Sequence, residues 1–155
     1  MNELSKKIKQ GCLLTCGNMT NFNTMTIGWG MIGTIWGKEV FMCFVRPTRY
    51  TFEFMEKYNY FTISFYNENY KEALSYLGTH SGKFCNKVSE VGFNPLSCGE
   101  SVTFIESYES LLCKKIYFQD MNLNEFQPTI KNTYYNVGGI HRFYIGEIIL
   151  KTNSN

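Results

Sequence analysis

Residues 40–51 have the sequence VFMCFVRPTRYT, which joins a continuous apolar run to a basic, hydroxyl-rich segment. An uninterrupted apolar run rich in Val and Phe is typical of a fully buried strand. Directly after it, Phe52, Met55 and Tyr58 recur at a spacing that places them on one stripe of an α-helix. The stretch therefore predicts a buried strand followed, over residues 49–58, by an amphipathic helix.

Other segments of the chain also favour strands. Residues 61–65 (FTISF) alternate strictly between apolar and polar positions, and residues 143–150 form another apolar run. Further strands are expected at residues 12–16, 24–36, 102–105 and 111–118, where residues 12–16 and 24–36 form a hairpin-like stretch broken by Gly28, Gly30 and Gly33. A second helix is expected over residues 70–77, with Asn69 as its N-cap. Six or seven strands with two helices predict a mainly β fold, a barrel with flanking helices.

Length and composition narrow the class of protein. The chain has 155 residues, of which 44% are hydrophobic and 17% aromatic, so we expect one folded domain over residues 1–155 and no intrinsic disorder. The formal net charge is only +2 and no long run of like charge occurs, which argues against a nucleic-acid partner.

Three features bear on location and on metals. Residues 10–36 carry no charge, but Thr, Asn and Gly interrupt them too often for a membrane span, and residues 1–10 lack the apolar core of a signal peptide. We therefore expect a cytoplasmic protein whose six cysteines are reduced thiols. Cys12 and Cys16 have no second cysteine pair or histidine cluster beside them, so no metal site is predicted.

Residues 28–33 (GWGMIG) match the glycine pattern of dinucleotide-binding loops, and Glu53 even lies 20 residues beyond Gly33. That pattern must open a long helix, whereas residues 34–37 (TIWG) are β-branched, aromatic and closed by another glycine. We interpret the glycines as part of a strand or hairpin that lets another strand or a flat ligand approach closely.

The junction at residues 45–51 brings two guanidiniums, two hydroxyls and the first amides of a helix together. Such a junction can bind an anion, above all a phosphate. The alternative is an ordinary helix start that Thr48 caps while Arg46 and Arg49 face solvent. A second polar loop at residues 77–83 (LGTHSGK) is by itself a turn with a cationic side chain.

Taken together, these segments resemble the flavin reductase-like family of FMN-binding split barrels, which includes flavoredoxin-type proteins. The resemblance runs through residues 23–29, 45–57, 61–65, 78–83 and 141–147 in that order. It departs at residues 81–87 (SGKFCNK), where relatives typically have Ser-Gly-Arg-Asp followed by an acid and Lys.

The resemblance implies an antiparallel six-stranded Greek-key barrel, a homodimer, and FMN in a groove near the subunit interface. It implies that the backbone of residues 25–28 meets the isoalloxazine edge and that Trp29 walls the pocket. It also implies that Arg46, Thr48, Arg49 and Thr51 hold the phosphate, and that residues 81–83 close over the ribityl-phosphate side or flank the ring. The implied cofactor-binding residues are Met25, Thr26, Ile27, Gly28, Trp29, Arg46, Thr48, Arg49, Tyr50, Thr51, Ser81, Gly82, Lys83 and Tyr144. His141 lies near the same site, either as a structural residue or as a catalytic candidate.

These implications leave three functions open. The first is an oxidoreductase in which NAD(P)H passes hydride to FMN and the electrons go on to a small-molecule or protein acceptor. The second is an FMN-containing electron carrier that exchanges electrons with a protein partner and does not use NAD(P)H. The third, a pyridoxamine-phosphate oxidase-type enzyme, requires basic side chains for a second phosphate, and we find no such group of residues.

Overall fold

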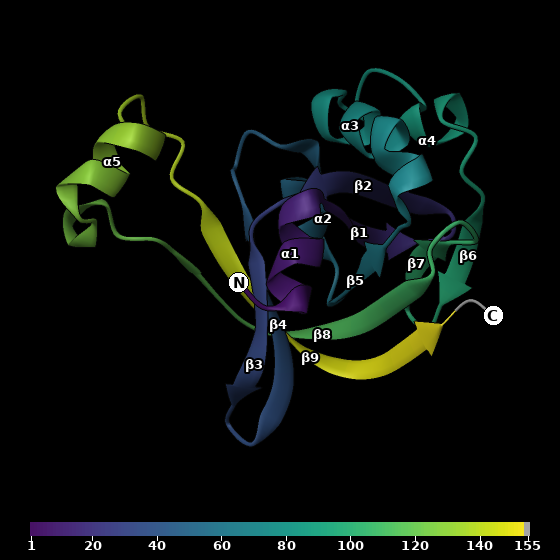
Figure 1. Ribbon diagram of the computed structural model, residues 1–155, viewed down its shortest axis with the longest axis horizontal. Coiled ribbons are helices and arrows are strands. Elements are labelled where there is room, and N and C mark those ends of the chain that lie inside the picture. Colours follow the sequence, from purple (N-terminus) through teal and green to yellow (C-terminus); the bar gives the residue numbers. More distant parts are fainter. Residues whose placement is uncertain (154–155) are drawn as a thin grey trace.

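The computed structural model describes residues 1–153 and is built around one large antiparallel sheet (Figure 1). Its strands lie in the order β2-β1-β5-β8-β9-β4-β3. Their bounds are β1 (Cys12–Asn18), β2 (Asn21–Ile27), β3 (Gly30–Ile35), β4 (Lys38–Val45), β5 (Tyr60–Phe65), β8 (Glu109–Asp120) and β9 (Arg142–Asn153). A small second sheet pairs β6 (Pro95–Cys98) with β7 (Ser101–Phe104).

The helices are short and lie around the sheet (Figure 1). They are α1 (Glu3–Gln10), α2 (Tyr50–Lys57), α3 (Lys71–Thr79), α4 (Lys87–Glu90) and α5 (Pro128–Tyr134), with single 3-10 turns η1 (Glu68–Tyr70) and η2 (Leu123–Glu125). Residues 121–141, which connect β8 to β9 and contain η2 and α5, project away from the sheet. We call this segment the arm.

The expected mainly β fold with flanking helices is confirmed, but the six-stranded Greek-key arrangement is not. The large sheet has seven strands, and it is open between its edge strands β2 and β3. The hairpin-like stretch expected from residues 12–16 and 24–36 is present only for β1 and β2, because β3 pairs with β4 and not with β2. Gly28 and Trp29, which link β2 to β3, therefore span the opening of the sheet.

The glycine pattern at residues 28–33 belongs to a strand, as predicted, because residues 30–35 are β3 and no helix follows. A side chain at Gly30 would meet the ring of Phe41 at 2.8 Å, so the glycine permits close approach of the neighbouring strand. The second helix begins at Lys71 rather than behind an Asn69 cap, because residues 68–70 form the turn η1. Three helices, α1, α4 and α5, were not predicted.

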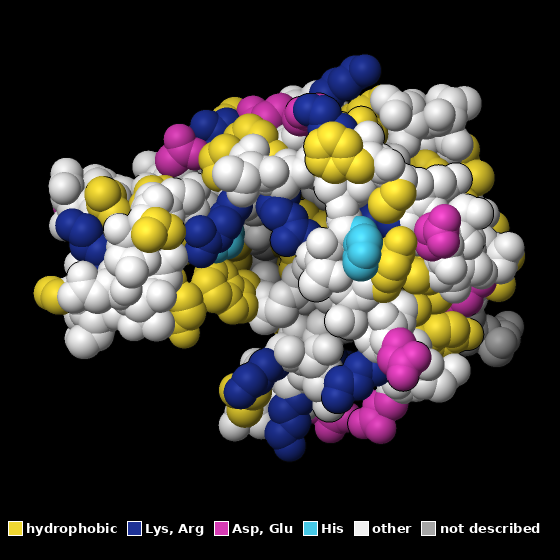
Figure 2. Space-filling view, turned by 90° about the horizontal axis from the view of Figure 1, so that it is seen from above, with side chains coloured by type: hydrophobic (Ala, Val, Ile, Leu, Met, Phe, Trp, Pro, Cys, Tyr) yellow, Lys and Arg dark blue, Asp and Glu magenta, His cyan; other side chains and the backbone are white. Residues whose placement is uncertain are grey.

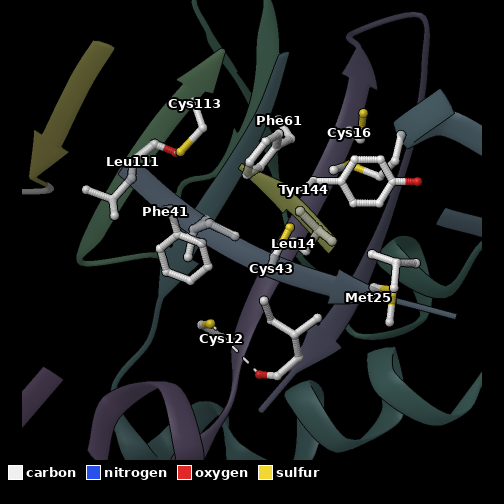
Figure 3. Packing of buried hydrophobic residues seen from close by; sticks show 14 of the residues in the cluster. Cys12, Leu14, Cys16, Met25, Phe41, Cys43, Phe61, Leu111, Cys113 and Tyr144 are labelled. Carbon is white, nitrogen blue, oxygen red and sulfur yellow. Dashed lines mark hydrogen bonds between the residues drawn. The ribbon is translucent and has the colours of Figure 1, made fainter. Parts of the chain in front are cut away.

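The main hydrophobic core lies inside the curved sheet and beneath α2 (Figure 3). Phe41, Phe61, Ile63 and Met55 are fully buried there, in agreement with their positions in the predicted strands and helix. A second cluster, with Leu13, Leu74 and Phe104, packs α3 against the other side of the sheet. The two clusters hold α2 and α3 on either side of β2, which is where the candidate site lies.

One finding concerns membranes: no helix within residues 1–153 is long and apolar enough to cross a bilayer.

Candidate functional site

Two neighbouring cavities lie along the edge strand β2 and share Met25. The first, of about 220 Å³, we call the cationic cavity; its lining residues are Asn23, Met25, Thr48, Arg49, Tyr50, Thr51, Gly78, Thr79, His80, Ser81 and Lys87. The second, of about 260 Å³, we call the aromatic cavity; its lining residues are Met25, Thr26, Ile27, Gly28, Trp29, Phe44, Arg46 and His141. Most of the residues predicted from the sequence therefore meet in one groove along β2.

The start of α2 forms one wall of the cationic cavity. Arg49 occupies the N-cap position and no side chain caps the helix, so the interpretation of Thr48 as an ordinary cap is not supported. Arg49 is half-buried, and its Nη2 donates a 2.8 Å hydrogen bond to the carbonyl of Gly78. Burial lowers the pKa of this guanidinium, which still stays charged at neutral pH. The helix start thus places a fixed cation and open amides beside the cavity.

Lys87 supplies the second cation, and sequence analysis did not identify it as a site residue. The residue is buried, with 3% of its surface exposed, and its Nζ donates 2.8 Å hydrogen bonds to the carbonyls of Leu77 and His80. Burial lowers the pKa of Lys87 to about 8, and the charge of Arg49 acts in the same direction. An ammonium has three donors, so one N–H of Lys87 is left for a further acceptor.

Neither cation forms an ion pair with an acidic side chain in the part of the chain that the structure describes. The ion pairs found within residues 1–153 involve Lys38, Arg142 and Lys151, and none of them includes Arg49 or Lys87. A buried charge without a counterion is unfavourable unless something of opposite charge binds beside it. The cationic cavity therefore has the chemistry of an anion site.

Close packing of Asn23 shapes the floor of this cavity. Its Nδ2 donates a 2.8 Å hydrogen bond to Oγ1 of the buried Thr51. A side chain at Gly82 would stand only 2.1 Å from Oδ1 of Asn23, so only glycine fits this position. Gly82 and Asn23 thus hold the loop after α3 close to the start of α2.

The structure places Lys83 apart from the cationic cavity. Ser81 lines the cationic cavity, but Gly82 and Lys83 line a different cavity of about 660 Å³, which shares Asn23 and Lys87 with the cationic one. Lys83 is exposed, whereas Lys87, four residues later, turns back under α3. The lysine beside the cavity is therefore Lys87, at a position that the sequence analysis did not single out.

Arg46 is also placed differently from the expectation that it holds a phosphate. It lines the aromatic cavity, not the cationic one, because the turn at residues 46–49 sends the two arginines to opposite ends of the groove. Its Nη2 donates a 3.1 Å hydrogen bond to the carbonyl of Tyr134, and its guanidinium lies 5.5 Å from the ring centre of Tyr135. Arg46 therefore links the arm to the end of β4.

The aromatic cavity is bordered by β2, Trp29 and His141. Because β2 is an edge strand, one side of its backbone carries N–H and C=O groups that no strand pairs. Trp29 is 44% exposed, and its ring centre lies 5.0 Å from that of His141 and 5.3 Å from that of Tyr134. A flat ring can enter between such groups, with its polar edge toward the strand backbone.

His141 is buried and held by the arm. Its Nδ1 is 2.8 Å from the hydroxyl of Tyr135, and no hydrogen bond within residues 1–153 reaches its Nε2. Burial lowers the pKa of His141 to about 4, with the charge of Arg46 acting in the same direction. The imidazole is therefore neutral at neutral pH. Tyr135 was not predicted from the sequence, because it follows a short polar helix, α5, that has no apolar periodicity.

Tyr144 does not belong to the groove, contrary to the prediction. It is fully buried in the main core, where Figure 3 shows it beside Cys16 and Met25. Its hydroxyl donates a 2.6 Å hydrogen bond to a carboxylate oxygen of Glu56 on α2. Tyr144 follows His141 by three residues in the sequence, but the alternation of side chains along β9 directs the ring of Tyr144 into the core.

The fold is similar to those of several solved structures. The FMN-binding protein from Thermus thermophilus with bound 1-cyclohex-2-enone has a TM-score of 0.70 at 15% identity, over 93% of this chain and 70% of that chain. Flavoredoxin from Methanosarcina acetivorans has a TM-score of 0.71 at 19% identity, over 92% of this chain and 67% of that chain. A protein from Shewanella frigidimarina, classed as a flavin reductase with a split barrel domain, has a TM-score of 0.73 at 16% identity, over 99% of this chain and 75% of that chain.

No family model and no curated protein matches the sequence. At these identities the structural likeness establishes the fold alone. The chain has the FMN-binding split-barrel fold that flavin reductase-like proteins and flavoredoxins share. The resemblance inferred from the sequence motifs is confirmed at this level.

Proposed function

We propose that this chain binds FMN in the groove along β2 and is an oxidoreductase of the flavin reductase-like kind. The observation that carries the proposal is the pair of cations, Arg49 and Lys87, which face one cavity without an acidic partner among the described residues. The FMN-binding proteins of the same fold support the choice of ligand.

The residues present fit the two ends of FMN. The phosphate matches the cationic cavity, where a guanidinium, the spare N–H of Lys87 and the first amides of α2 converge. The isoalloxazine matches the aromatic cavity, which has the unpaired backbone edge of residues 25–28 on one side and Trp29 on another. Met25, which lines both cavities, would lie beside the ribityl chain that joins the two ends.

The proposed roles of the individual residues follow from this placement. Bound FMN supplies the hydride and electron chemistry, and the protein supplies position and environment. Arg49 and Lys87 anchor the phosphate, Trp29 excludes water from one side of the ring, and Arg46 holds the arm beside the ring. His141 is neutral at neutral pH, so in this proposal it donates or accepts a hydrogen bond and carries no charge.

We propose NADH or NADPH as the electron donor. Among residues 1–153, no carboxylate lines the groove to pair with a histidine for acid-base catalysis, and hydride transfer to a flavin requires no such pair. A transiently bound nicotinamide needs only room over the ring, which the open side of the aromatic cavity offers. The alternative is an electron carrier that does not use NAD(P)H, and the likeness to flavoredoxins, which are not necessarily enzymes, keeps this alternative open.

Spectroscopy tests both parts of the proposal. We expect the purified protein to be yellow or to bind added FMN, and to bind riboflavin more weakly because riboflavin lacks the phosphate. Under anaerobic conditions, NADH or NADPH should then bleach the bound flavin. A protein that ignores both flavins refutes the proposal, and bleaching by dithionite but by neither nucleotide favours the carrier.

We also propose a homodimer, because aromatic side chains form a continuous stripe on the outer face of β4, β8 and β9. Ring contacts of 5.9, 6.1 and 6.5 Å link Trp36 to Tyr117, Tyr117 to Phe143, and Phe143 to Phe44, and Phe44 lines the aromatic cavity. Trp36 is 59% exposed, and exposed aromatic residues are favoured at protein interfaces. Light scattering at micromolar concentration should give a dimer mass, and Trp36→Lys should shift it toward the monomer.

A further inference from the structure

An apolar cleft of about 530 Å³ separates the arm from α1 and β3. Figure 2 shows the opening between the arm, on the left, and the body of the molecule, with hydrophobic side chains on its wall. The cleft shares Gly28, Trp29 and Phe44 with the aromatic cavity, so the two spaces adjoin. Its volume lies within the range of about 300–1,000 Å³ that is usual for small-molecule sites.

The walls of the cleft are almost free of charge. Met31, Phe126 and Ile130 are among the residues that line the cleft. Of the lining residues that the structure describes, Lys9 is the one with a charged side chain. A ligand that carries phosphates or several carboxylates would therefore meet too few cations here. A neutral, flat and apolar molecule matches the cleft in both charge and shape.

One polar pair lies at the junction between the cleft and the aromatic cavity. Tyr135 lines the cleft, His141 lines the aromatic cavity, and the hydroxyl of Tyr135 is 2.8 Å from Nδ1 of His141. Both side chains are buried, and Nε2 of His141 is free of hydrogen bonds from residues 1–153. A ligand with a carbonyl group at one end can use this pair while the rest of it fills the apolar space.

We propose that this cleft is the site of the electron acceptor, and that the acceptor is a neutral aromatic carbonyl compound or quinone. The role of the cleft as an acceptor site rests on the proposed FMN function, but the binding of such a molecule in the cleft does not. Reduction of a quinone to its hydroquinone takes up two electrons and two protons. Both electrons and one proton leave reduced FMN as hydride, the second proton comes from solvent, and FMN returns to its oxidised form.

A matched pair of probes tests the charge preference by isothermal titration calorimetry. The first probe is 2-acetylnaphthalene, which is flat and neutral, and the second is 2-naphthoate, which has nearly the same shape with a negative charge. We expect 2-acetylnaphthalene to bind one site per chain, with or without FMN. We expect 2-naphthoate to bind at least about tenfold more weakly, because its carboxylate would lose water in a cleft lined, among the described residues, by a single cationic side chain, Lys9, while the nearby Arg46 is already bonded to the carbonyl of Tyr134. Equal or tighter binding of 2-naphthoate overturns the proposal.

A matched pair of variants tests the location. Ile130 lines the cleft and is 41% exposed, whereas Ile149 on β9 does not line it and is 47% exposed. We expect Ile130→Lys to weaken the binding of 2-acetylnaphthalene at least about tenfold and Ile149→Lys to leave it unchanged. Equal effects of the two variants overturn the location.

The outcomes separate this inference from the proposed function. If the protein binds FMN but not 2-acetylnaphthalene, the cleft proposal is wrong and the FMN proposal stands; a cleft closed by a second copy of the chain would give this result. If the protein binds no FMN but binds 2-acetylnaphthalene with the expected response to Ile130→Lys, the cleft remains a binding site and its role as an acceptor site fails.

Discussion

Replacing Lys87 with methionine removes a buried charge from the cationic cavity while keeping most of the side-chain volume. Two of the three Lys87 donors are held by the carbonyls of Leu77 and His80, which leaves one for the phosphate. A hydrogen bond to a charged group contributes about 1.5–3 kcal/mol, so Lys87→Met should weaken FMN binding about 10- to 150-fold. Riboflavin binding should change far less, because riboflavin shares the ring and the ribityl chain but has no phosphate.

The chain offers a control four residues earlier, in the loop that precedes α4. Lys83 is exposed and lines a different cavity, so Lys83→Met should leave the affinity for FMN within about twofold of the original, as expected for an exposed charge. Fluorescence titrations of both flavins against the original protein and both variants measure the contrast, with thermal melts to check folding. Equal weakening of FMN and riboflavin by Lys87→Met, or a larger effect of Lys83→Met, would refute the assignment of Lys87 to the phosphate.

Four further predictions follow from the same contacts. Lys87 has a pKa of about 8 and loses its charge above that pH, so the Kd for FMN should rise as the pH increases from 7 to 9. Lys87→Arg should flatten this rise because arginine stays charged. A rise of equal size for riboflavin would contradict the explanation. Arg49→Ala should weaken FMN binding about 10- to 150-fold and Arg46→Ala should preserve the preference of FMN over riboflavin, as titrations with both ligands can determine. Tyr144→Phe should lower the free energy of unfolding by about 1–2 kcal/mol in urea denaturation, since its hydroxyl bonds to a half-exposed carboxylate, and should leave the Kd for FMN unchanged. The chain has two histidines, so His80→Gln leaves His141 as the one imidazole in the NMR spectrum. The signals of His141 should show no protonation between pH 8 and 6 and should begin to shift only as the pH approaches 4. A midpoint near pH 6.5 would mean that the imidazole is not buried as described.

The sequence pattern predicted those parts of the fold that local periodicity determines. The strands β4 and β5 and the helix α2 were expected almost at their observed bounds, because each has an apolar repeat of its own. The helix α1 was missed because its eight residues include only two large apolar side chains, Leu4 and Ile8, which is too few to show a period. The division of residues 24–36 between two hairpins, β1–β2 and β3–β4, was missed because the pattern of apolar residues does not show which neighbouring strand each half pairs with.

The same distinction holds for the candidate site. Residues 25–29 were predicted from the resemblance to split barrels, whereas residues 48–51 were also indicated by the chemistry of the helix start, and each group is continuous in sequence. The choice between Lys83 and Lys87, and the separation of Arg46 from Arg49, depend on how a loop and a turn run in space. Both lysines have similar neighbours in sequence, so their burial could be seen only once α3 and the following loop were placed.

A crystal structure of the protein with bound FMN tests the central claim most directly. We predict one FMN per chain, with phosphate oxygens within hydrogen-bond distance of Arg49 and of Nζ of Lys87, and with the isoalloxazine against residues 25–29. A phosphate held instead by Arg46 or Lys83, or FMN bound outside the groove along β2, would contradict the account.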